Sequence, residues 1–156
     1  MPSNEELQGI WHQYENGHEH QPSSARQAIE WAVAEGLVEL PTVDPYDVLA
    51  SRMAQALRLE YDTDYQGRRF RVNHAARVTA AGVQYTFWAI MGFATHDHME
   101  RSFTQRREQI IGECVQLRTD VDVYNVMSGA ETSEFQLVLD FTDDVAERLI
   151  ASSSGN

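Results

Sequence analysis

The sequence predicts an α+β fold built as one globular domain. Apolar residues recur at helical spacing in the first 60 residues and again after residue 95. Between them, apolar and polar side chains alternate, and one turn dipeptide interrupts the alternation, which indicates an antiparallel hairpin. A chain of 156 residues can bury a core of its own. We therefore expect residues 1–156 to form a single domain with flexible ends at residues 1–4 and 152–156.

Two helices are predicted at the N-terminal end. The first covers Glu5–Glu15, because its apolar residues fall on one stripe and Asn4 can accept hydrogen bonds from the first free amides. The second begins after Ser23 or Ser24, both good capping residues, and stops at Gly36.

A short strand and a third helix follow. Leu37–Leu40 is an apolar stretch typical of a strand, and a proline closes it. Asp44 before Pro45 is a strong helix start, since Asp can cap and proline loses no needed donor at the first position. We expect this helix to continue to about Tyr61. Its expected buried stripe includes Val48, Leu49, Met53, Ala56 and Leu57.

The hairpin begins after Gly67, where the period changes to two. Phe70–Val78 alternates apolar residues with a face rich in arginine, and Ala81-Gly82 offers the turn. Gln84–Met91 returns as the partner strand and is rich in aromatic and β-branched residues. Both faces of this second strand are apolar, so either helices cover both faces or one face binds a partner, including a second copy of the chain.

The C-terminal part is predicted to contain a long helix, a strand and a final helix. The long helix starts near Thr95 or Asp97, and a short turn restarts near residue 119. Phe135–Phe141 alternates regularly and is the clearest single strand of the sequence. Thr142 and the acids after it predict the start of the last helix, which runs to about residue 150.

Charge is distributed unevenly along the chain. The formal net charge is −12, which argues against general affinity for a phosphate backbone. Residues 67–118, however, hold 8 arginines and 4 acids, whereas residues 1–66 hold 3 arginines and 12 acids. Residues 119–156 hold 1 arginine and 8 acids. The middle of the chain is therefore a basic region between acidic flanks.

The arginines of the hairpin and of the long helix are the first candidate binding residues. An element order of three helices and a basic hairpin is analogous to a winged-helix module, which favours a nucleic acid as partner. The third helix brings no net positive charge, and the arginines can instead pair with the acids of the flanks. The predicted binding residues are Arg68, Arg69, Arg71, Arg77, Arg101, Arg106 and Arg107.

Histidines form the second candidate site. His96 and His98 are two residues apart, and imidazole and carboxylate groups are common ligands of zinc. With His74 and Glu100 they would hold a divalent metal ion in a metal-dependent hydrolase. On a helix, however, side chains two positions apart diverge, and the histidines then lie in solvent or make polar contacts.

Acidic surface supports a third hypothesis, in which the chain is an inhibitor of phage type that binds a nucleic-acid-binding protein. Regularly spaced acids would imitate a phosphate backbone, although the same charge also serves solubility.

Several enzyme classes lack their motifs here, including phosphate-binding glycine loops, nucleophile elbows and lysine chemistry. Cys114 is the only cysteine and is expected to be a core residue. No stretch is long and apolar enough for a membrane span, so we expect a cytoplasmic protein. The leading hypothesis is a non-enzymatic binding or regulatory protein, bacterial or phage-like and without a cofactor. Its arginine-rich hairpin and helix would bind a nucleic acid or a partner protein.

Overall fold

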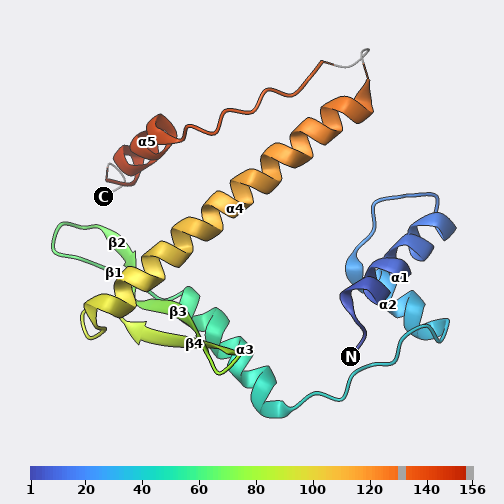
Figure 1. The fold of residues 1–156 in the computed structure, drawn as a ribbon, viewed down its shortest axis with the longest axis horizontal. Coiled ribbons are helices and arrows are strands. Elements are labelled where there is room, and N and C mark those ends of the chain that lie inside the picture. Colours follow the sequence, from blue (N-terminus) through green and yellow to red (C-terminus); the bar gives the residue numbers. More distant parts are fainter. Residues whose placement is uncertain (130–132, 154–156) are drawn as a thin grey trace. The chain divides into compact units, whose positions relative to one another are not determined.

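The computed structural model describes residues 1–129 and 133–153 and confirms the α+β class (Figure 1). Contacts group the chain into two compact units, Met1–Ser51 and Arg52–Asn156, and each is described by itself. The prediction of one domain stays a prediction. The described helices are α1 (Asn4–Gly17), α2 (Ala25–Ala34), α3 (Pro45–Arg58), α4 (His96–Ser128) and α5 (Thr142–Ser153). The described strands are β1 (Tyr61–Thr63), β2 (Arg69–Arg71), β3 (Asn73–Ala80) and β4 (Val83–Ile90).

Capping boxes start both helices of the first unit. In α1, Glu6 N–H donates to Ser3 Oγ over 3.1 Å and Ser3 N–H donates to the Glu6 carboxylate. The cap is therefore Ser3, and the prediction that Asn4 caps this helix was wrong. Ser24 caps α2 in the same way with Gln27, which confirms one of the two predicted caps.

The first unit builds its core where α1 faces α2. Ile10 and Tyr14 from α1 and Ala28 and Ala32 from α2 are buried, and the small alanines let the two helices approach closely. The Tyr14 ring stacks on Trp11 and meets Trp31 edge-on, with ring centroids 5.9 and 5.7 Å apart. Aromatic contacts therefore carry much of this small core.

Three predictions between residues 37 and 61 were wrong. Residues 37–40 form no strand, and the described part of the first unit offers them no strand to pair with. The third helix ends at Arg58 rather than near Tyr61, because the chain continues into β1. No residue of α3 is buried, and the side chains of Leu49 and Met53 are each 65% exposed, so the expected apolar stripe covers no core.

The predicted strand over Phe70–Val78 is divided between two small antiparallel sheets. β2 pairs with β1, and β3 pairs with β4, with the strand break at Val72. The turn at Ala81-Gly82 is confirmed, since both residues have positive φ angles, 51° and 78°, as a tight hairpin of this hand requires.

Helix α4 is one continuous helix of 33 residues, without the predicted restart near residue 119. Thr95 caps it by accepting from His98 N–H over 3.1 Å, which agrees with the predicted start near Thr95 or Asp97. Its first turns lie against β3, as Figure 1 shows. None of the helices in residues 1–129 and 133–153 is long and apolar enough to span a membrane.

The segment before α5 was wrongly predicted to be a strand. Phe135–Phe141 has no strand partner among the described residues. Instead, the Asn125 side chain accepts from Phe135 N–H over 2.9 Å and donates to its carbonyl over 3.0 Å. The final helix begins at Thr142, as predicted, where Asp140 Oδ1 accepts from Thr142 N–H over 3.1 Å.

Candidate anion-binding pocket

A pocket of about 260 Å³ lies between the β3–β4 sheet, the first turns of α4 and the end of α3. Three of its lining residues are buried, Asn73, His74 and Ser102, whereas its arginines are exposed. The pocket is therefore a polar hollow with charged side chains at its rim. Its lining residues are Arg58, Arg71, Asn73, His74, Ala75, Arg77, Thr86, Trp88, Ser102, Gln105, Arg106 and Gln109.

One face of the hairpin supplies the wall on the sheet side. Ala75 lies opposite Trp88, and Arg77 lies opposite Thr86, in the register of the two strands. Cross-strand partners share a face of the sheet, so all four project towards the same side. The alternation of the strand thus places the Arg77 guanidinium on the same side as the indole of Trp88.

A polar stripe of α4 supplies the opposite wall. Ser102, Gln105, Arg106 and Gln109 are three or four residues apart and so share one face of the helix. The Gln105 side chain accepts from Arg77 N–H and donates to the Arg77 carbonyl, each over 2.8 Å. Gln105 thereby satisfies backbone groups at the open edge of β3 and fixes Arg77 next to the turn that carries Arg106.

The end of α3 closes the third side. The Arg58 guanidinium carbon lies 5.2 Å from the centroid of the Trp88 ring. Asn73 Nδ2 donates to the Leu57 carbonyl over 3.1 Å and to the Glu60 carboxylate over 2.7 Å. These contacts hold the last turn of α3 on the sheet, which positions Arg58 at the rim.

Positive charge collects in this pocket without a matching acid. Arg58, Arg71, Arg77 and Arg106 all line it, and no aspartate or glutamate does. Within the described parts of the chain, none of the four makes an ion pair. Guanidinium groups recognise carboxylate and phosphate oxygens through paired hydrogen bonds, so the pocket has the chemistry to bind an anion.

The pKa of His74 reflects the burial and the positive charge of this pocket. Burial is the main reason that its pKa lies below the ordinary value of 6.5, and electrostatic repulsion by the neighbours Arg106, Arg71 and His98 lowers the pKa further. Because a carbonyl only accepts, His74 Nε2–H donates to the Arg71 carbonyl over 2.8 Å, and this contact acts in the opposite direction. His74 is thus kept neutral beside the arginines.

This lowered pKa predicts a loss of stability in mild acid. As the pH is lowered from 7 to 5, the unfolded chain takes up a proton on His74 near pH 6.5, whereas His74 in the folded chain is protonated only at lower pH. The free energy of unfolding therefore decreases as the pH is lowered. Urea denaturation at several pH values between 7 and 5 measures this decrease in the free energy of unfolding, and the decrease should be smaller in His74→Gln. Equal falls in both proteins would contradict the assignment. Asp64 and Asp140, whose pKa values are lowered from 3.8, titrate below the window.

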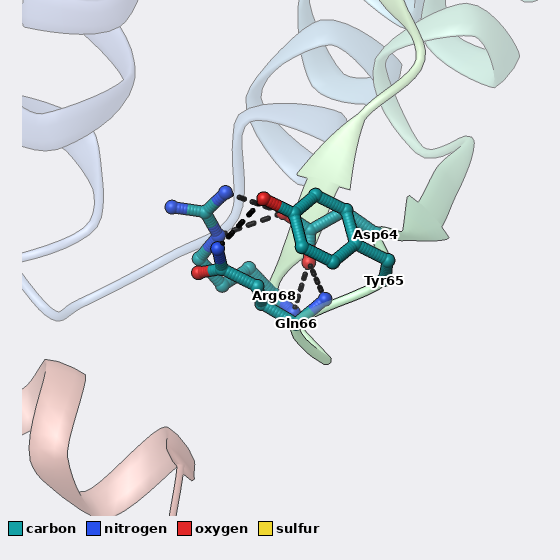
Figure 2. A network of polar contacts seen from close by, with 4 residues as sticks. All are labelled: Asp64, Tyr65, Gln66 and Arg68. Carbon is teal, nitrogen blue, oxygen red and sulfur yellow. Dashed lines mark hydrogen bonds and ion pairs between the residues drawn. The ribbon is translucent and has the colours of Figure 1, made fainter.

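Arg68 lies outside the pocket and is bound within its own turn. Figure 2 shows its side chain directed at Asp64, which accepts from Arg68 Nε and from a terminal nitrogen, both over 2.7 Å. The same carboxylate accepts from the amides of Gln66 and Arg68 over 2.9 and 2.8 Å. Hydrogen bonds from the Arg68 amide are the largest cause of the lowered pKa of Asp64. This arginine is therefore neutralised by an acid four residues away.

The other predicted arginines also lie elsewhere. Arg69 places its guanidinium carbon 3.9 Å from the centroid of the Tyr61 ring. Arg107 approaches Glu108 at 3.8 Å and lines an apolar groove farther along α4. Arg101 lies beside Asp97 and Glu100 on the exposed side of the helix. Of the seven predicted residues, Arg71, Arg77 and Arg106 come together.

The four candidate metal ligands do not form a cluster. His98 Nε2–H donates to the His74 carbonyl over 2.8 Å, and His74 donates to Arg71, so both Nε2 atoms face backbone. His96 and Glu100 are exposed. Across residues 1–129 and 133–153, no three histidine, cysteine or acidic side chains are placed to hold a metal ion.

Sequence reasoning missed Arg58, Trp88 and Ser102 as site residues. The predicted third helix extended to Tyr61 and included Glu60, so it had no net positive charge, and only the fold brings Arg58 to the hairpin. A signal for Ser102 did exist, since it continues the polar stripe of Gln105 and Gln109 on α4. Comparisons of the chain with protein-family models, with curated proteins and with solved structures find no match.

Proposed function

We propose that this protein is a non-enzymatic nucleic-acid-binding protein that holds phosphate groups at the arginine pocket. The observation that supports the proposal is the convergence of Arg58, Arg71, Arg77 and Arg106 on one hollow that no carboxylate lines. These residues come from α3, β2, β3 and α4, so the fold itself assembles the charge. A solvated arginine face would need no such assembly.

The charge distribution restricts how a nucleic acid can bind. The net charge of −12 disfavours general binding of a phosphate backbone, and attraction is expected at the pocket, where arginines of residues 67–118 meet Arg58. Contacts with one or two phosphates at the pocket and its rim are therefore expected, rather than a long basic track. An acidic partner protein offers carboxylates to the same guanidinium groups, and the experiment below separates the two partner classes.

Salt dependence of binding tests the proposal. Labelled single-stranded DNA, duplex DNA and RNA are titrated with protein, and fluorescence anisotropy is measured at about 50 and 200 mM salt. If two phosphates of a single strand are neutralised, the affinity should fall about sevenfold between these salt concentrations. Absence of binding to all three nucleic acids at the lower salt concentration would reject the proposal and favour an acidic protein partner.

A homodimer and a cytoplasmic location, both predicted from the sequence, are also proposed. Tyr85 and Phe87 lie on the face of the hairpin opposite to that of Trp88, with exposed fractions of 45% and 53%, and a homodimer through these two rings is the arrangement that would cover them. Their rings are 6.0 Å apart and stacked, so they present one continuous apolar surface. The cytoplasmic location stays a prediction.

A further inference from the structure

We infer that the arginine pocket seats a phosphomonoester, the terminal phosphate of a nucleic-acid strand or of a nucleotide, rather than an internal phosphodiester. The inference rests on the proposed function and specifies which phosphate the pocket selects. It is argued from the size of the pocket, from the buried residues in its lining and from the number of arginines around it that make no ion pair among the described residues.

Size limits the ligand to a small group. The cavity of about 260 Å³ is smaller than the pockets that enclose drug-sized ligands, which begin at about 300 Å³. Three of its lining residues, Asn73, His74 and Ser102, are buried, whereas its arginines are exposed, so an entering ligand would meet the arginines first. A strand end can enter such a hollow, whereas an internal phosphate would have to bring both flanking nucleotides with it.

The positive charge of the pocket also favours a phosphomonoester over a phosphodiester. A phosphomonoester carries a charge of about −1.5 to −2 at neutral pH and three terminal oxygens, whereas a diester carries a charge of −1. Arg58, Arg71, Arg77 and Arg106 provide more guanidinium donors than one diester can use. A dianion with three oxygens pairs with several of them at once, and charge-assisted hydrogen bonds are the stronger kind.

The wall on the α4 side holds an unused hydroxyl. Ser102 is fully buried, and its Oγ makes no hydrogen bond to any residue that the structure describes. A buried polar group without a partner costs free energy, so such groups are uncommon without a reason. Ser102 lies one helical turn before Arg106, and an oxygen of a bound phosphate would offer the hydroxyl an acceptor after a small shift.

The experiment compares one oligonucleotide in three forms, with a phosphate at its 5′ end, at its 3′ end or at neither end. Affinities are measured by anisotropy with the full chain, and inorganic phosphate and a nucleoside monophosphate serve as competitors. We expect one phosphorylated form to bind about tenfold more tightly than the form without a terminal phosphate. Arg106→Gln should remove this preference, and Arg106→Lys, which keeps the charge but not the paired hydrogen bonds, should keep part of it.

Arg101→Gln is the matched control, because Arg101 lies on the same helix and does not line the pocket. It should leave the preference unchanged, and circular dichroism verifies that each variant is folded. Equal affinity for all three oligonucleotides would overturn the inference and leave the proposed function standing. Direct binding of the nucleoside monophosphate, measured by calorimetry, without binding of any oligonucleotide would support the pocket chemistry and reject the nucleic-acid function. A preference that survives in Arg106→Gln would place the phosphate site elsewhere.

Discussion

Reversing two charges in the pocket, with Arg77→Glu and Arg106→Glu in one protein, should weaken nucleic-acid binding about 100-fold or more. Each substitution removes charge-assisted hydrogen bonds, which contribute about 1.5–3 kcal/mol, and adds a repulsive carboxylate. Both side chains are exposed and their backbones keep the pairing with Gln105 and the helix, so the fold should remain. Anisotropy at about 50 mM salt measures the loss.

A second double variant isolates position from net charge. Arg101→Glu with Arg107→Glu changes the net charge by the same amount, with both substitutions on α4, but neither residue lines the pocket. Glutamate and arginine have similar helix propensities, so the control protein should be folded. We expect the control to lose less than about fivefold in affinity. Equal losses in the two double variants would show that the overall charge of the region, and not the pocket, determines binding.

The salt dependence of the two proteins adds a second readout. Loss of one or two phosphate contacts should reduce the slope of log affinity against log salt by about 0.7–1.4 on a single strand. The Arg101 and Arg107 variant should keep the slope of the unmodified protein. An unchanged slope in the pocket variant would mean that its arginines do not contact phosphate.

Local signals in the sequence predicted helix starts well because capping involves only neighbours in the chain. Ser24 and Thr95 each accept a hydrogen bond from the amide three residues later, and nothing outside the first turn is needed. The Ala81-Gly82 turn was predictable for the same reason, since two residues with positive φ satisfy it.

Strands were harder to predict because alternation does not identify a partner. Phe135–Phe141 has the most regular alternation of the sequence, yet the described chain gives it no neighbouring strand. Asn125 satisfies the backbone of Phe135, and this contact joins residues ten positions apart. Only pairing converts an alternating segment into a sheet.

The candidate site was half predictable. Composition pointed to the region that contains Arg71, Arg77 and Arg106, which line one pocket, but it could not tell which arginines of the region are already paired. For Arg68 the answer was nearby, because Asp64 lies four residues earlier in the same turn. For Arg58 no neighbouring residue gave the answer, because its position at the rim depends on the ring of Trp88, which lies 30 positions later in the sequence.

Truncation of one buried aromatic ring should unfold the first unit. Tyr14 is only 7% exposed and contacts the rings of Trp11, His18 and Trp31, so Tyr14→Ala removes the largest side chain of that core. Replacing a buried aromatic residue by alanine costs about 3–5 kcal/mol, while a unit of this size is only marginally stable. Hydrogen exchange measured by mass spectrometry should therefore show α1 and α2 losing their protection together.

The control for this variant removes the same side chain where it contributes little. Tyr46 is 84% exposed, so Tyr46→Ala should leave the protection of α1 and α2 within experimental error of the unmodified chain. Protection that persists in Tyr14→Ala would mean that the alanine interface of α1 and α2 is sufficient without the rings. Loss of protection in both variants would instead assign Tyr46 a buried role. The expected contrast follows from burial alone, because the two substitutions delete identical atoms.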